Sequence, residues 1–216
     1  MRTTKFAVLG LGRFGSTLVK ALSDEGMEVL AADWDLDNVE AVKDHASLAV
    51  SMDTTNRAAL LEQGLDGVDV AIVGIGENFE ANLLTSLLLK QIGVKRVISR
   101  AMNRLQAQIL EGIGIEDVVS PEEESARRLA RNLVRPNLLE FVELAEDHGI
   151  VQFEAPAAFA GRSIMDLDLR RRHNVNIVAI KRAEGRVVSV PKPDDVIGKE
   201  DILVVIGSER DIERIV

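Results

Sequence analysis

The chain of 216 residues contains no cysteine, no tyrosine, one tryptophan and three histidines. The absence of cysteine excludes disulfides, thiolate zinc sites, iron–sulfur clusters and cysteine nucleophiles. The absence of tyrosine excludes hydride transfer that relies on a tyrosine–lysine pair. The histidines are too scattered along the sequence to suggest a metal site, at His45, His148 and His173. The range of chemistry open to this chain is therefore narrow.

A basic charge balance and a long hydrophobic run are also missing. The formal net charge of −9 argues against nucleic acid as a partner, because such partners need a basic face. The best apolar run, Leu83–Leu89, is far shorter than the roughly 20 residues of a spanning helix. From the few residues before the first strand-like segment, which include no apolar core of about 7–15 residues, we expect no signal peptide. With 46% hydrophobic and 28% charged residues, we expect a globular protein of one or two domains that does not cross a membrane.

The first 120 residues alternate short apolar runs with helical patterns. Strands are predicted at Lys5–Gly10, at Glu28–Asp33 and near residues 47–51, 69–74, 95–99 and 116–119. Helices are predicted at Arg13–Glu25 and near 36–44, 56–63, 78–92 and 103–111. This alternation predicts right-handed crossovers and a parallel sheet, and the continuous apolar strands indicate burial on both faces. The predicted fold class is therefore α/β, beginning with a Rossmann-like parallel-sheet domain.

The pattern changes after residue 120. Ser120, Pro121 and Glu123 predict the start of a long helix, Pro136 should stop or kink it, and 137–147 resumes helical periodicity. A small α+β subdomain follows, with strands expected at 149–154, 176–181, 186–190 and 202–206 and short helices at 163–172 and 209–215. The predicted organisation is a Rossmann-like domain over 1–135, a helical hinge over 136–148 and a C-terminal subdomain over 149–216.

A glycine-rich turn joins the first predicted strand to the first predicted helix. Gly10, Gly12 and Gly15 match the pattern G-x-G-x-x-G in the strand–turn–helix context that the pattern requires. Gly10 permits the tight turn, Gly12 lets the backbone approach a phosphate, and Gly15 allows close packing of helix and strand. The N–H groups and dipole of the helix N-terminus then favour an anion.

Acidic and polar residues end the second and third predicted strands. Asp33 follows Gly15 by 18 positions, where a carboxylate can accept hydrogen bonds from ribose hydroxyls and would repel a 2′-phosphate. Asp53 and Thr54 follow the third strand. They either touch an adenosine or cap the helix that begins near Asn56.

Further candidates lie on the same predicted edge of the sheet. Gly74 and Gly76 follow the fourth strand and either line the crevice or only form the turn. Arg13 stands within the glycine loop and Arg100 ends the fifth strand, and a guanidinium suits phosphate geometry. Glu122, in the first turn of the long helix, either holds a divalent cation beside phosphates or stabilises the helix N-terminus.

Three long segments carry a family resemblance: KFAVLGLGRFGSTL, VGIGENFEANLLTSLLLKQIGVKRVISRA and, near the end, SIMDLDLRRRHNVNIVAIKR. Together they resemble the KtrA/TrkA family of potassium-transport subunits with the regulator-of-potassium-conductance (RCK) fold, and the resemblance covers essentially the whole chain. It implies a cytoplasmic gating ring that binds nucleotides and controls a separate membrane-embedded potassium channel or transporter subunit of the KtrB/TrkH type.

The resemblance also implies roles for individual residues. The glycine motif with Phe14 binds the cofactor, Arg13 senses a γ-phosphate, and Asp33 binds ribose. Glu122 matches a position linked to a cation, Mg²⁺ or Ca²⁺, near the phosphates at a dimer interface. The sequence departs from many relatives at SMDTTN, where they carry a glycine or asparagine before the threonine, and this weakens the assignment of Asp53.

Two further expectations concern ligands and assembly. Some members of the family bind cyclic di-AMP in the C-terminal subdomain, and the matching region contains Ile164, Asn176, Ile177 and Pro191, although the isoleucines also suit a plain core. The helix 78–92 carries an apolar face broader than one sheet contact needs. In RCK rings this region packs between subunits, so we expect a homo-oligomer, as dimers assembled into a tetrameric or octameric ring.

The leading functional hypothesis is a non-enzymatic regulator that responds to ATP and ADP. The two nucleotides must interact differently with two conformations, since equal affinity shifts no equilibrium. An NAD(H)-binding redox sensor explains the glycine loop and Asp33 equally well. An NAD-dependent oxidoreductase does so too, but it needs a substrate domain and an acid–base residue that this chain hardly offers.

Overall fold

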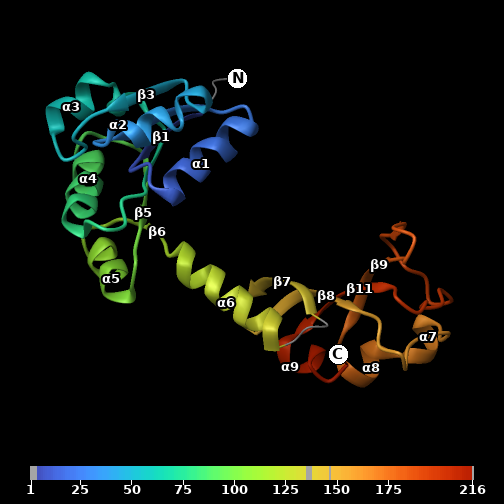
Figure 1. The fold of residues 1–216 in the computed structure, drawn as a ribbon. Coiled ribbons are helices and arrows are strands. Elements are labelled where there is room, and N and C mark those ends of the chain that lie inside the picture. Colours follow the sequence, from blue (N-terminus) through green and yellow to red (C-terminus); the bar gives the residue numbers. More distant parts are fainter. Residues whose placement is uncertain (1–3, 135–137, 146, 216) are drawn as a thin grey trace. The chain divides into compact units, whose positions relative to one another are not determined.

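The computed structural model describes residues 4–134, 138–145 and 147–215. The chain forms two compact units, Met1–Glu124 and Ser125–Val216 (Figure 1). In the described residues, no helix has the length and apolar character needed to span a bilayer.

The first unit is built on a six-stranded, fully parallel sheet with strand order β3-β2-β1-β4-β5-β6. Its strands are β1 Lys5–Leu9, β2 Glu28–Asp33, β3 Leu48–Ser51, β4 Val70–Val73, β5 Arg96–Arg100 and β6 Asp117–Val119. The predicted parallel sheet is confirmed, and its six strands occur at the predicted places along the chain. From β1 the strand order runs outward in both directions, through β2 and β3 on one side and through β4, β5 and β6 on the other. Ligands of open α/β sheets bind at the point where the order changes direction in this way.

Helices connect the strands of this sheet. They are α1 Arg13–Asp24, α2 Leu36–Glu40, α3 Arg57–Glu62, α4 Phe79–Gln91 and α5 Arg104–Gly112, with 3₁₀ turns η1 Lys43–His45 and η2 Leu65–Gly67. Helix α6 Pro121–Val134 follows the last strand β6, and the division between the two units falls within it. The predicted helix near 36–44 is therefore a short helix followed by a 3₁₀ turn. The helices from α2 to α5 each begin at a side-chain cap, supplied by Asp35, Asn56, Asn78 and Asn103.

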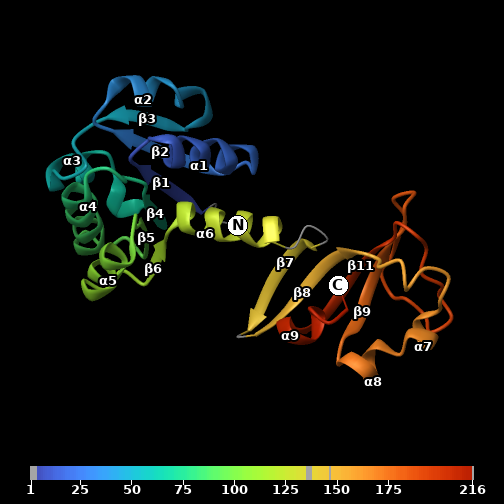
Figure 2. The same cartoon turned by 60° about the horizontal axis from the view of Figure 1, so that its bottom comes forward.

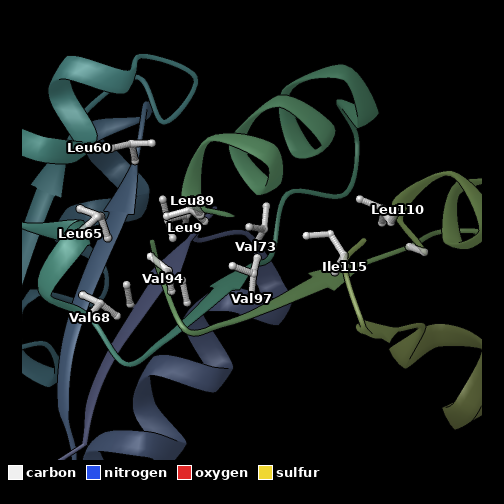
Figure 3. Close-up of a cluster of buried hydrophobic side chains, with 13 residues drawn as sticks. Leu9, Leu60, Leu65, Val68, Val73, Leu89, Val94, Val97, Leu110 and Ile115 are labelled. Atoms are coloured by element: carbon white, nitrogen blue, oxygen red, sulfur yellow. The ribbon is translucent and has the colours of Figure 1, made fainter. Parts of the chain in front are cut away.

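Both faces of the sheet are buried, as the continuous apolar strands predict. Successive residues of a strand point to opposite faces. Ala7 and Leu9 of β1 belong to one core with Leu89 of α4, whereas Val8 belongs to a second core with Val19 of α1. Figure 3 shows the first of these cores, in which strand residues meet Leu89. The two cores fix the sheet between helices, and the carboxyl ends of the strands form the edge at which ligands of open α/β sheets generally bind.

The second unit contains a five-stranded antiparallel sheet with order β10-β9-β11-β8-β7. Its elements are β7 Leu138–Ala145, β8 His148–Glu154, α7 Ile164–Leu167, α8 Leu169–His173, β9 Asn176–Lys181, β10 Val187–Val188, β11 Ile202–Ser208 and α9 Glu209–Ile212. Phe153, Ile180 and Leu203 are fully buried in its core. The predicted small α+β subdomain is thus confirmed.

The prediction of a helix over 137–147 is wrong. Residues 138–145 form strand β7, which pairs antiparallel with β8 through a turn that includes Asp147 (φ 62°), and Figure 2 shows the two strands side by side. A short apolar segment is compatible with either periodicity, and the adjacent strand supplies the hydrogen-bonding partner that decides between them. Pro136, the predicted kink, lies outside the described residues. The domain boundaries at 135 and 148 remain predictions.

A second difference concerns the predicted helix at 163–172. It forms as two short helices, because Asp168 between them adopts a left-handed conformation (φ 46°) that a helix cannot continue. Ser163 and Asp166 cap the first of them reciprocally, as a capping box.

Candidate functional site

The candidate site lies at the carboxyl ends of the parallel strands, where the glycine loop follows β1. Gly10 has a φ of +92°, and its N–H donates to Ala32 O at 2.8 Å. A Cβ on Gly10 would lie 2.7 Å from the backbone nitrogen of Ile75, and one on Gly15 would lie 2.0 Å from Gly10 O. These two glycines are therefore required for the backbone to fold. Gly12 differs, since a Cβ there would meet nothing within 4 Å.

Among the residues that the structure describes, no side chain caps the first N–H groups of α1. Its N-cap is Gly12, which offers no side-chain hydrogen bond, and its first turn contains no acidic residue. The first turn of a helix leaves N–H donors unpaired and carries a partial positive charge. Open space above Gly12 and this uncapped terminus are together the kind of geometry that favours an anion such as phosphate. Arg13, the first residue of α1, is exposed beside it.

Asp33 at the end of β2 fixes the glycine loop. Its side chain is buried; Oδ2 accepts from the N–H of Leu11 at 2.5 Å, and Oδ1 accepts from the N–H of Asp35 at 2.9 Å. A carboxylate oxygen can accept two hydrogen bonds, so acceptor capacity remains for a ribose hydroxyl. Asp33 therefore both holds the loop and lies where the sequence predicts ribose recognition.

Arg100 at the end of β5 packs into the same edge. Its guanidinium lies 5.7 Å from the centroid of the Phe14 ring and donates to Gly74 O at 3.4 Å. A Cβ on Gly76 would lie 2.6 Å from Nη1 of Arg100, so this glycine makes room for the guanidinium. Nε of Arg100 is buried, and within the described residues it has no hydrogen-bond partner. The structure thus brings Phe14, Gly74, Gly76 and Arg100 together.

Glu122 joins this group from the first turn of α6 by an ion pair with Arg100. Partial burial acts to raise the pKa of the Glu122 carboxyl, but the hydrogen bond from Arg100, the backbone N–H and the attraction of the guanidinium together lower it. The carboxylate is therefore ionised near neutral pH. No cluster of three or more metal-binding side chains occurs in the part of the chain that the structure describes.

Asp53 and Thr54 are used locally. Asp53 Oδ1 accepts from the hydroxyl of Thr55 at 2.6 Å and from its N–H at 2.9 Å, and these bonds lower the pKa of Asp53. Asn56, and not Asp53, caps α3. Thr54 is buried, with its hydroxyl 3.0 Å from that of Thr85 on α4. Asp53 thus stabilises the turn after β3, and Thr54 stabilises the contact between this turn and α4. Neither role needs a ligand.

Helix α4 carries a buried polar face that was not predicted from the sequence. Asn82 is fully buried, and its amide donates to Ile75 O at 2.7 Å and Arg100 O at 3.1 Å. Ser86 on the next turn lies 2.5 Å from the hydroxyl of Ser99 on β5. Asn82 therefore ties the loop after β4 to the end of β5, which positions Arg100. The signal was available, because Asn82, Ser86 and Leu89 follow helical spacing on one face.

The apolar residues of α4 are divided between core and surface. Phe79, Leu83, Leu88 and Ile92 are partly buried against the core, while Leu84 is exposed. In the second unit, Ile164 and Ile177 pack against the core and Asn176 is exposed on β9. Both isoleucines are thus partly buried against this core, and the cyclic di-AMP interpretation of the region remains a prediction.

The first unit is a Rossmann-like α/β domain whose glycine loop and strand-end acid are typical of nucleotide-binding proteins. Residues 6–121 match the TrkA-N domain family and residues 150–216 match the TrkA-C domain family. The chain therefore belongs to the TrkA-N/TrkA-C family of potassium-transport proteins, as the sequence resemblance predicts.

Its relatives include two proteins of Bacillus subtilis (strain 168). The chain is 46% identical to Ktr system potassium uptake protein C over 210 residues, which cover 97% of this chain and 95% of the relative. It is 35% identical to Ktr system potassium uptake protein A over 214 residues, with coverage of 99% and 96%.

Solved structures share the fold. The RCK domain of GsuK matches with a TM-score of 0.57 and 22% identity, over 97% of this chain and 45% of that chain. The GsuK channel bound to NAD matches with a TM-score of 0.58, over 100% of this chain and 38% of that chain. The chain thus spans less than half of the GsuK chains, and these similarities establish its fold.

Proposed function

We propose that this chain is a nucleotide-responsive regulatory subunit of a potassium uptake system, with ATP and ADP as its ligands. The observation that carries the proposal is the open, uncapped N-terminus of α1 above Gly12, with Asp33 at the end of the neighbouring strand. This is an arrangement that accepts phosphates and a ribose together. Similarity to Ktr system potassium uptake proteins over nearly the whole chain supports the transport context.

Arg13 supplies the difference between the two nucleotides. It is exposed at the N-terminus of α1, where its guanidinium can meet a γ-phosphate that ADP lacks. A contact made with only one nucleotide gives the differential affinity that a conformational equilibrium needs. In this proposal the ATP-bound and ADP-bound forms favour different arrangements of a ring of copies.

The remaining assignments follow from the same proposal. The chain is not an enzyme, lies in the cytoplasm, and gates a separate membrane-embedded potassium channel or transporter subunit. Leu84, exposed on α4, is one of the residues through which copies would associate into a ring. Cyclic di-AMP would bind in the second unit, where Asn176 is exposed on β9.

A divalent cation, Mg²⁺ or Ca²⁺, is proposed at Glu122. Mg²⁺ is usually bound by one or two carboxylates together with phosphate oxygens and water, whereas Ca²⁺ takes about six to eight oxygen ligands. Glu122 fits as a single carboxylate ligand, and a bound cation would neutralise phosphate charge. Because Arg100 pairs with the same carboxylate, the cation competes with that guanidinium.

The second candidate ligand is NAD(H), which Asp33 favours as strongly because NAD contains the same adenosine ribose. A thermal-shift comparison of ATP, ADP, NADH and cyclic di-AMP separates the candidates, since a ligand that binds only the folded state raises the unfolding temperature. The proposal expects the largest shifts with ATP and ADP. A shift with NADH alone would favour the redox sensor, and turnover of NADH would favour an oxidoreductase.

A further inference from the structure

Trp34 is the only tryptophan of the chain, and 80% of its surface is exposed. Tryptophan is rarely left so exposed, because its large apolar rings gain more than most side chains from leaving water. It directly follows Asp33, so it leaves β2 at the same edge of the sheet as the glycine loop. An exposed indole at this place requires an explanation other than packing within the domain.

The backbone around Trp34 is fixed although its side chain is not packed. Ser51 at the end of β3 donates its hydroxyl to Trp34 O at 3.1 Å, and the N–H of Met52 donates to Asp33 O at 2.8 Å. On the other side, Asp33 accepts from Leu11 of the glycine loop and from Asp35. The position is therefore held both to β3 and to the loop, as expected of a residue that presents its side chain to a ligand.

The neighbouring residues indicate which part of a ligand would meet the indole. In dinucleotide-binding folds the acid at the end of the second strand binds a ribose, here Asp33. The base is attached to that ribose, so it lies close to the residue that follows the acid. Every base has a flat π-face that can stack on an aromatic side chain, so such stacking does not depend on which base is bound.

We propose that Trp34 forms a stacking platform for the adenine base of a bound nucleotide. The inference rests on the proposed function and deepens it, because it assigns base recognition to a residue outside the glycine motif. Asp33 then holds the sugar while Trp34 covers the base. Phosphate, ribose and base are recognised by the glycine loop, Asp33 and Trp34 in turn.

The other occupant to consider is a protein surface. Leu36, two residues further on, is 60% exposed and could extend an apolar contact. Leu48 on β3 is also exposed. It pairs with Leu30 of β2, whereas Asp33, the residue before Trp34, pairs with Ser51 at the end of β3. Leu48 therefore lies three residues before the end of β3. The exposed leucine on β3 is thus set back from the edge that carries Trp34. A stacked base uses the edge residue alone, whereas a protein contact would use Leu36 as well.

Fluorescence of the full chain reports on Trp34 directly, because the chain has no other tryptophan and no tyrosine. We expect ATP and ADP to change the emission saturably, with the same affinity as calorimetry measures, and inorganic triphosphate to leave it unchanged. In calorimetry Trp34→Ala should bind ADP about ten-fold or more weakly, and Trp34→Phe should retain most of the affinity. Leu36→Ala is the matched control and should bind ADP like the parent chain.

The outcomes separate the two proposals. If the parent chain binds ADP while Trp34→Ala binds equally well, stacking is overturned and nucleotide binding stands. Equal ADP affinity combined with loss of self-association in both Trp34→Ala and Leu36→Ala would assign the surface to a second copy and also overturn stacking. If the parent chain binds no adenine nucleotide in calorimetry, both proposals fail. Circular dichroism melting of each variant confirms that it is folded.

Discussion

Arg100 at the end of β5 and Glu122 in the first turn of α6 form an ion pair within the first unit. The guanidinium also meets Phe14 and Gly74, so one side chain links the glycine loop, the loop after β4 and the start of α6. This relationship explains why residues far apart in sequence belong to one site. It also means that Glu122 already has a cationic partner that any bound cation must replace.

The ion pair predicts a pH-dependent contribution to stability. The pKa of Glu122 is lowered in the folded state, so the stabilisation is present above the unfolded pKa of about 4.3 and is lost as pH falls through the lower folded value. Because the carboxylate is largely exposed, we expect Glu122→Gln to cost less than about 1 kcal/mol at pH 7. Urea unfolding should show this difference shrinking below about pH 4.3.

Glu124→Gln is the control for that experiment, since Glu124 is exposed in the same first turn of α6. Both substitutions remove a carboxylate from a helix N-terminus, so only their difference reports the pair with Arg100. Equal effects of the two substitutions at every pH would show that the ion pair contributes nothing to stability.

The glycine loop predicts opposite outcomes for two alanine substitutions. Gly15→Ala should destabilise the fold by about 2 kcal/mol or more, because its Cβ would lie 2.0 Å from Gly10 O. Gly12→Ala should cost about 1 kcal/mol or less, since nothing lies within 4 Å. Its methyl group would nevertheless occupy the space for a phosphate and weaken ADP binding. Thermal melting and calorimetry measure the two effects separately, and a stable Gly12→Ala that binds ADP normally would contradict the phosphate site.

The buried amide of Asn82 should be important for stability. Asn82→Ala removes the amide donor of two partly buried hydrogen bonds, to the carbonyl oxygens of Ile75 and Arg100, and we expect a total cost of about 1–3 kcal/mol. Leu84→Ala on the same helix should change the unfolding free energy of the monomeric unit little, because Leu84 is 41% exposed. Denaturant unfolding compares the two. A smaller loss for Asn82→Ala than for Leu84→Ala would refute the positioning role.

Arg13 should distinguish ATP from ADP. We expect Arg13→Ala to lose the difference between the two affinities while binding ADP nearly as the parent chain does, because only ATP offers a γ-phosphate. Arg57 is the matched control, since it is exposed and is likewise the first residue of its helix, α3. Titration calorimetry of both variants tests the role. If Arg13→Ala still binds ATP and ADP with the affinity difference of the parent chain, Arg13 does not distinguish the two nucleotides.

Most of the first unit could be predicted because its signals are local. Strands such as β1 and β4 are continuous apolar runs, and the glycine motif appears in its required context between strand and helix. Strand β7 could not be predicted in this way, since its identity depends on pairing with β8. The contact of Thr54 could not be predicted either, because its partner Thr85 becomes a neighbour only when the sheet forms. For Asn82 the helical spacing could indicate a buried polar face, but not its backbone partners Ile75 and Arg100.

The central claim is that this chain binds adenine nucleotides and responds differently to ATP and ADP. Calorimetric titration of the full chain with each nucleotide, with sedimentation velocity on the same samples, tests it most directly. We predict that both nucleotides bind at one site per chain, with different affinities and different sedimentation of the two complexes. Absence of binding, or equal affinities with identical sedimentation, would contradict the account.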